Sequence, residues 1–262
     1  MSSPTMSQKL TAEAIGTAIL VFIGAGSVPL TLFLTAGAGG TGIDGTAGLS
    51  TISFAFAFAI FAAVYSVGHI SGCHINPAVT IALLATRKID GRTAGGYIVA
   101  QLIGAFIGAG LTLIILTGND PAKLGLGAVS VNANAGLAVG FAAEVIGTAI
   151  LVFTVFGAAV SGKAPAGFAG LIIGFIVYGI IILVGPITGA SLNPARELAP
   201  ALLGQAIGAT PVPVDQLIVV YIFGSTIGGV VGAFLYEFIG REATEPAPAS
   251  AVASARAEGQ GA

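Results

Sequence analysis

The sequence predicts an all-α membrane protein: a bundle of six transmembrane helices and two re-entrant half-helices, built as an inverted repeat. Three observations predict this fold. The chain is strongly apolar, two long uncharged runs are each broken at an Asn-Pro step, and the second half repeats polar and apolar residues of the first half in the same order. We expect residues 1–240 to form a single membrane channel domain, with the repeats at about 8–117 and 136–240.

The composition makes lipid the natural solvent for most of this chain. Of the 262 residues, 55% are hydrophobic and 8% are charged, and the mean hydropathy is +1.00. A soluble domain carries about 25% charged residues, so this chain could not cover its surface in water. The net charge of −2 is too weak to indicate a nucleic-acid partner, and the single cysteine, Cys73, excludes an internal disulfide framework.

Six apolar segments are long enough to span a bilayer, whose core of about 30 Å needs roughly 20 helical residues. They lie near 10–34, 49–70, 94–117, 136–160, 167–185 and 216–239. Their hydrophobicity is continuous and does not alternate, which disfavours a β-barrel.

Two uncharged runs are too long for single spans, namely 45–86 and 164–195. An Asn-Pro step interrupts each run, at 76–77 and at 193–194. Because Asn favours the N-cap and Pro the first helical position, each step predicts the start of a new short helix. The loop before it must be buried in protein or line a wet cavity, since bare backbone cannot face lipid. We expect re-entrant half-helices near 77–86 and 194–203.

The basic residues predict the orientation. In a six-span arrangement, one side of the membrane receives Lys9, Arg87, Lys88, Arg92, Lys163, Arg241 and Arg256, and only Lys123 falls in a loop on the other side. The positive-inside rule then predicts a multi-pass cell-membrane protein with cytoplasmic N- and C-termini. Residues 241–262 are rich in Ala, Pro and Glu, which predicts a disordered cytoplasmic tail.

The internal repeat indicates a solute pathway. AEAIGTAILVF at 12–22 recurs as AEVIGTAILVF at 143–153, and Asn-Pro-Ala occurs once in each half. Three spans per half invert the second copy, and inverted repeats with broken helices place a substrate path at the repeat interface. Two GxxxG pairs predict close helix packing: Gly104 with Gly108, and Gly228 with Gly232.

The paired half-helices predict a barrier to protons and cations. Each helix N-terminus carries about half a positive charge, and two such ends meeting at mid-membrane repel cations. If the side-chain oxygens of Asn76 and Asn193 cap their own helices, both amide N–H₂ groups are free to face the lumen. A water molecule accepting from both would be oriented so that a continuous proton wire is broken.

Arg196 is the only basic residue deep in an apolar segment, and such a charge is costly and usually functional. The alternative is a structural ion pair with Glu197, which we disfavour because adjacent helical residues do not face each other.

Two Asn-Pro-Ala motifs, with HISG before the first and Arg directly after the second, resemble the aquaporins and glycerol facilitators of the major intrinsic protein family over about 8–240. The motif residues are Asn76, Pro77, Ala78, Asn193, Pro194 and Ala195. By counting from the motifs, the resemblance implies a selectivity filter of Phe56, Ile181, Ala190 and Arg196, and it implies a homotetramer with one pore per subunit. Ile181 departs from the usual His of water-selective relatives and the Gly of glycerol facilitators, and it is similar to archaeal-type aquaporins.

Other residues have supporting roles in this interpretation. Backbone carbonyls before each Asn-Pro step should line the vestibules as acceptors, at Gly72, Cys73, His74, Gly189, Ala190 and Ser191. Glu13 and Glu144 occupy matching repeat positions, as a proton relay or, as we favour, as buried structural carboxylates that accept N–H bonds from the re-entrant loops. His69 is expected to pack within the first of these loops.

The implied activity is a passive channel for water that also admits small neutral solutes (glycerol, hydrogen sulfide, ammonia) and excludes protons and ions. Its partners are membrane lipid and the solutes themselves. The sequence contains no enzyme constellation and no metal-ligand spacing, and no cofactor is expected. Two alternatives stay open: a glycerol or small-polyol facilitator of the same fold, and, less favoured, an ion-coupled secondary transporter.

Overall fold

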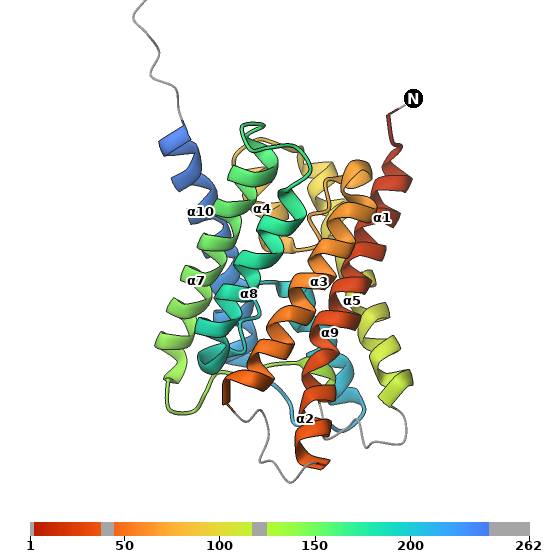
Figure 1. Cartoon of the computed structure of the whole chain (residues 1–262), viewed down its shortest axis with the longest axis vertical. Helices are drawn as coiled ribbons and strands as arrows, with labels where there is room; N and C mark the ends of the chain where they lie inside the picture. Colours follow the sequence, from red (N-terminus) through yellow and green to blue (C-terminus); the bar gives the residue numbers. More distant parts are fainter. Residues whose placement is uncertain (1–2, 38–44, 117–124, 241–262) are drawn as a thin grey trace, which may run out of the picture.

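The computed structural model describes residues 3–37, 45–116 and 125–240, and these residues form helices and connecting loops with no strand. Six of the described helical stretches are long and apolar enough to cross a membrane, as predicted. They stand side by side as a bundle (Figure 1). The predicted tail at 241–262, together with Lys123, Arg241 and Arg256, lies outside the described residues.

The spans follow the chain in order, and three of them contain stretches of π-helix. The elements are α1 (Met6–Ile19), η1 (Leu20–Ala25) and α2 (Ser27–Gly37) in the first span, α3 (Gly45–Ser71) in the second, α5 (Gly91–Leu116) in the third, α7 (Gly136–Val155) with η3 (Phe156–Val160) in the fourth, α8 (Ala169–Thr188) in the fifth, and η4 (Gln216–Gly224) with α10 (Ser225–Gly240) in the sixth. A short 3₁₀ turn, η2 (Gly125–Gly127), precedes an irregular segment that leads into α7.

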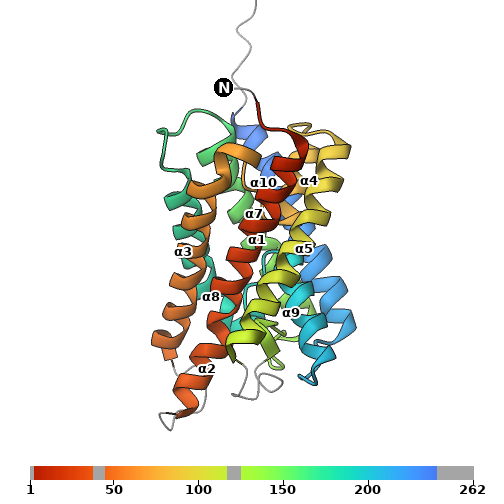
Figure 2. The same cartoon turned by 90° about the vertical axis from the view of Figure 1, so that its right-hand side faces the viewer.

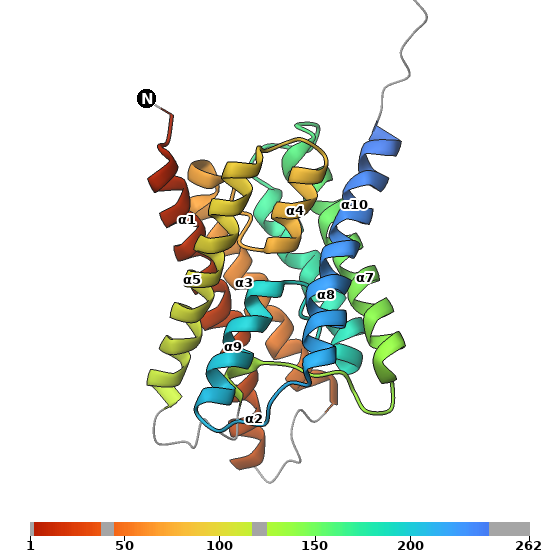
Figure 3. The same cartoon turned by 180° about the vertical axis from the view of Figure 1, so that it is seen from behind.

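Two shorter helices lie inside the bundle, α4 (Pro77–Ala85) and α9 (Pro194–Ala206). Each begins directly after an Asn in extended conformation whose side-chain oxygen accepts a backbone N–H of the first turn. Figure 3 shows α4 in one half of the bundle and α9 in the other, with their starts approaching each other near the middle. The chain starts and α10 ends at the same end of the molecule (Figure 2).

The loops before α4 and α9 repeat one unusual backbone pattern. Positive φ angles occur at Gly72, Cys73 and Ile75 in the first loop, and at Gly189, Ala190 and Leu192 in the second. Four of these six residues are not glycine, and each left-handed residue with a side chain costs about 1–3 kcal/mol and persists only when its surroundings enforce it. Both halves therefore contain the same strained loop conformation, and other groups must hold both loops in place.

Both GxxxG pairs allow helices to approach at backbone distance. A Cβ atom added at Gly104 would lie 2.1 Å from the Ala14 carbonyl oxygen, and one added at Gly232 would lie 2.1 Å from the Ala149 carbonyl oxygen. These contacts join α5 to α1 and α10 to α7. The equivalent contacts of the other two glycines are Gly228 with the Val145 carbonyl oxygen at 2.3 Å and Gly108 with the Ala18 carbonyl oxygen at 2.6 Å, so the pairing is the same in each half.

We expect Gly104→Ala to destabilise the bundle, although Ala is the better helix former. The added methyl group meets backbone that cannot move aside, and overpacking of this kind costs about 1–3 kcal/mol. Thermal unfolding of the purified protein in detergent measures the effect. Gly110→Ala is the matched control, since it lies on the same helix with nothing within 4 Å of the added atom. Equal midpoints for the two variants would contradict the close approach.

Candidate functional site

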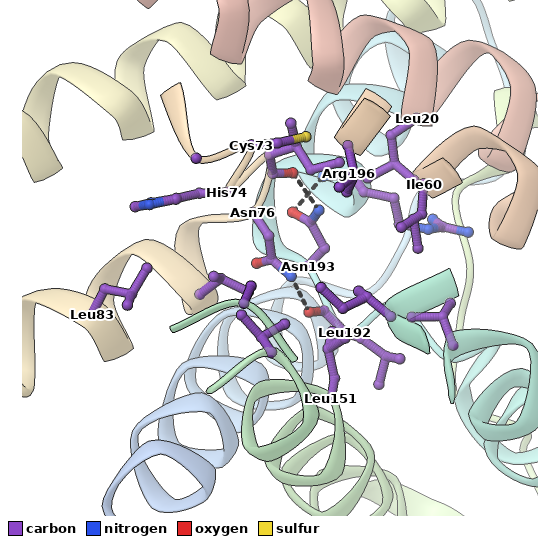
Figure 4. A pocket seen from close by; sticks show the side chains of 18 of the residues that line it. Leu20, Ile60, Cys73, His74, Asn76, Leu83, Leu151, Leu192, Asn193 and Arg196 are labelled. Atoms are coloured by element: carbon purple, nitrogen blue, oxygen red, sulfur yellow. Dashed lines mark hydrogen bonds between the residues drawn. The ribbon is translucent and has the colours of Figure 1, made fainter. Parts of the chain in front are cut away.

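The two half-helices meet through reciprocal hydrogen bonds. Asn76 Nδ2 donates to the Leu192 carbonyl at 2.8 Å, and Asn193 Nδ2 donates to the Ile75 carbonyl at 2.9 Å (Figure 4). Each Asn oxygen caps its own helix, at 2.8 Å from Ala78 N and at 3.0 Å from Ala195 N. The expectation that the whole amide N–H₂ group of each Asn is free to face the lumen is therefore corrected. One N–H of each Asn is bound to the opposite loop, and only one remains for a solute.

Glu13 holds the first loop from a fully buried position on α1. Its Oε1 accepts from the Ser71 hydroxyl at 2.7 Å and from His74 N–H at 2.9 Å. Its Oε2 accepts from Ile75 N–H and from the Gln101 side-chain amide, both at 2.7 Å. Four donors thus satisfy one buried carboxylate, and two of them are loop backbone groups.

Glu144 does the same for the second loop from α7. Its Oε1 accepts from the Thr188 hydroxyl at 2.7 Å and from Ser191 N–H at 2.9 Å. Its Oε2 accepts from Leu192 N–H at 2.8 Å and from the Ser225 hydroxyl at 3.1 Å. Neither carboxylate lines the cavity described next, and their contacts are those of loop supports.

One cavity of about 330 Å³ runs past the junction and is lined by both halves. All four positions assigned to the filter by counting lie on it: Phe56, Ile181, Ala190 and Arg196. So do both motif asparagines and, from the loops, Gly72, Cys73, His74, Ile75, Ser191 and Leu192. Ile75 and Leu192, whose carbonyls accept the Asn bonds, were not predicted from the sequence.

Some predicted residues lie behind the cavity wall. Gly189 does not line it, contrary to expectation, because a Cβ there would lie 2.4 Å from Val129, against which this backbone packs. The Pro-Ala residues of both motifs are buried in the first turns of α4 and α9 and support the asparagines from behind. His69, expected within the first loop, is exposed in the last turn of α3.

Only one of the three guanidinium nitrogens of Arg196 makes hydrogen bonds to the described residues. It is 1% exposed, and its Nη1 donates to the Gly127 carbonyl and to Glu197 Oε2, both at 2.9 Å. Its Nε and Nη2 have no hydrogen-bond partner among the described residues. The guanidinium carbon lies 5.1 Å from the centre of the Phe56 ring. Arg196 therefore lines the cavity beside an aromatic face, with two nitrogens that have no partner among the described residues.

The expectation that Arg196 and Glu197 do not meet is wrong. Side chains one position apart diverge at Cβ, but both of these are long and both reach the backbone at residues 127–129, where η2 ends. Glu197 Oε1 accepts Val129 N–H at 3.0 Å while its other oxygen binds Arg196. A shared contact with this segment brings the two charges together.

Two glycines make room for the filter and were not predicted. A Cβ at Gly24 would lie 2.6 Å from the Phe56 ring, so the absence of a side chain in η1 admits the aromatic group. Gly127 has φ +91°, and a Cβ there would lie 2.2 Å from the Ala25 carbonyl oxygen. No sequence signal marks either residue, since both contacts are long-range.

The first loop carries a second polar cluster. His74 Nδ1 lies 3.2 Å from the Thr80 hydroxyl, which also accepts from the Gln101 amide at 2.9 Å. The His74 ring contacts Tyr97 edge to face. Toward this end of the cavity, Lys88 lines the wall and pairs with Glu237 at 2.8 Å.

The family model described as major intrinsic protein matches residues 1–236. The chain belongs to the major intrinsic protein family. The prediction from the paired motifs is thereby confirmed, and this is a family of membrane channels and not of enzymes.

Members similar to this chain include archaeal proteins. The probable aquaporin AqpM of Archaeoglobus fulgidus is 42% identical, over 91% of this chain and 99% of that protein. Aquaporin AqpM of Methanothermobacter thermautotrophicus is 41% identical over the same shares. Aquaporin Z of Rhodopseudomonas palustris is 37% identical, over 90% of this chain and 95% of that protein. The X-ray structure of the aquaglyceroporin from Plasmodium falciparum has the same fold, with a TM-score of 0.72, 24% identity, and coverage of 88% of this chain and 94% of that chain.

Glu13→Gln and Glu144→Gln should each impair folding of this family member. A Gln amide turns one acceptor oxygen into a donor that faces existing donors, and an unsatisfied buried group costs about 1–3 kcal/mol. Yield of folded protein and thermal midpoint in detergent measure the loss. Glu237→Gln, at a half-exposed carboxylate, is the control. Variants that stay fully stable but lose ion-coupled uptake would favour a transporter.

Proposed function

We propose that this member of the major intrinsic protein family is a passive water channel of the cell membrane, which also admits glycerol, hydrogen sulfide and ammonia and excludes protons and ions. One observation carries the proposal: Asn76 and Asn193, held by each other's loops, line the same cavity where two helix N-termini meet. Two N–H donors and two positive helix ends then act on one passing molecule.

The geometry supports exclusion of protons. A water oxygen at the junction would accept from the remaining N–H of each Asn, so its own hydrogens would point away along the cavity toward carbonyls of the loops. Neighbouring waters on the two sides would be oriented in opposite senses, which interrupts a proton wire. The positive ends of α4 and α9 add an electrostatic barrier to hydronium and to metal cations.

The filter residues support water as the main solute. Arg196 offers Nε and Nη2, and the other three positions add no side-chain donor or acceptor because they are Phe56, Ile181 and Ala190. Water needs few partners, whereas glycerol must satisfy three hydroxyl groups in the same space and loses more when partners are missing. Small weakly hydrated solutes such as hydrogen sulfide lose less on entering an apolar constriction.

The glycerol facilitator remains the second candidate, and one feature favours it. Ala190 is small, so the wall beside Arg196 is set back. The ion-coupled transporter has weaker support, because Glu13 and Glu144 are both satisfied by four hydrogen bonds and neither lines the cavity.

The orientation and assembly are also part of the proposal. The loops that carry Arg87, Lys88 and Lys163 lie at the end of the bundle where the chain starts (Figure 1). We assign this end to the cytoplasm, with both termini, by the positive-inside rule. We further propose a homotetramer with one pore per subunit.

Stopped-flow light scattering on proteoliposomes tests the solute assignment. We expect water permeability at least about tenfold above empty vesicles, with a low activation energy, and glycerol permeability well below that of a dedicated glycerol facilitator measured alongside. Proton flux should equal that of empty vesicles. Glycerol flux rivalling the facilitator would overturn the water-first assignment.

Ile181→Ala should widen the cavity and raise glycerol flux by about tenfold, the lower end of the range by which one methylene alters discrimination in a hydrophobic pocket. Water flux should change by less than about twofold because no polar partner is lost. Leu183→Ala on the same helix is the control, since Leu183 is 72% exposed on the outer surface of the protein. Unchanged glycerol flux in Ile181→Ala would show that this position does not limit passage.

A further inference from the structure

Glu197 places a second charge directly against the filter. It is 0% exposed, and it divides its two oxygens between Arg196 Nη1 at 2.9 Å and Val129 N–H at 3.0 Å. Counting from the motif asparagines, the equivalent position in the first half is Thr80, which is neutral. The carboxylate is therefore a feature of the half that carries the arginine.

The pairing determines which edge of the guanidinium a solute meets. The Gly127 carbonyl and Glu197 both bind Nη1, on the side of residues 127–129. Nε and Nη2 form the remaining edge and have no partner among the described residues. Without Glu197, only the Gly127 carbonyl would bind the guanidinium, and the positive charge of Arg196 would have no neighbouring negative charge.

Charge is as important as geometry in this position. A buried cation without a counterion is costly, and in a medium of low polarity it attracts anions strongly. The free Nε–Nη2 edge has the fork geometry that binds planar oxyanions through two parallel hydrogen bonds. An uncompensated Arg196 would thus be an anion-binding site in the middle of a water path.

We propose that Glu197 is the positioning and charge-compensating residue of the filter. It turns Nη1 away from the cavity and cancels the charge of Arg196, so that the filter offers two donors to neutral solutes without binding anions. The positive helix ends at the junction of α4 and α9 add a second barrier to cations. This inference rests on the proposed water channel, because it concerns the same filter.

Glu197→Gln tests it, with water permeability measured in nitrate and in gluconate at equal ionic strength. We expect water flux through Glu197→Gln to fall about tenfold in nitrate, as bidentate binding to a buried, uncompensated guanidinium predicts. Wild type should be insensitive to nitrate. Asp215→Asn, which removes one negative charge from an exposed position before η4, should match wild type. Glu197→Asp keeps the charge and should restore most of the insensitivity. Equal nitrate insensitivity of Glu197→Gln and wild type would overturn the proposal.

A second pair of variants covers the case in which Glu197→Gln does not fold. Arg196→Gln leaves the Glu197 carboxylate unpaired beside the cavity and should leak sodium ions, measured with a trapped fluorescent indicator. Arg196→Gln/Glu197→Gln removes both charges, which a buried ion pair tolerates better than losing one partner, and should leak severalfold less. Equal leaks from the single and double variants would refute charge compensation.

The outcomes separate this inference from the proposed function. Wild-type vesicles that conduct no more water than empty ones would defeat the water channel itself. Wild-type water flux together with an unchanged charge response in the Glu197 variants would defeat only the role of Glu197.

Discussion

The structure depends on two hydrogen bonds across its centre, from Asn76 to the Leu192 carbonyl and from Asn193 to the Ile75 carbonyl. Each bond joins a side chain of one half to the backbone of the other, so neither half-helix has its final position alone. The bonds fix where the positive ends of α4 and α9 meet, and they leave one N–H of each amide for a solute. Displacement of either loop would therefore remove both the electrostatic barrier at the helix ends and the contact between the amide N–H groups and the solute.

The carbonyls that accept these bonds belong to left-handed residues with side chains, Ile75 and Leu192. Such backbone persists only if its N–H groups are held, and Glu13 and Glu144 hold them from inside the bundle. The repeated segments also supply Gly16 and Gly147, where a Cβ would lie within 2.8 Å of the Ile75 or Leu192 side chain. The strain at the centre is therefore balanced by groups encoded in one repeated stretch of sequence.

Local and periodic signals predicted most of the fold. The spans, the Asn-Pro helix starts and the paired glycines all depend on neighbours in sequence or on the repeat, and they lie close to their predicted positions. The contacts of residues 127–129 were not predictable, because nothing local links Gly127 or Val129 to α9. That segment explains both errors near the filter: it draws Arg196 and Glu197 together, and it packs against the backbone of Gly189.

Comparison of the two halves distinguishes the residues that hold the loops from the residues that give the cavity its selectivity. Positions that agree in chemistry across the repeat, such as Glu13 and Glu144, hold the loops by matching hydrogen bonds. Positions that differ carry unlike polar groups: His74 and Thr80 contact each other in the first half, whereas the Arg196–Glu197 pair occupies the second. An inverted repeat with identical halves would present the same surface to a solute from either side. Charge at only one end of the cavity therefore has to come from residues that break the repeat, and a buried cation in one half needs its counter-charge in that half.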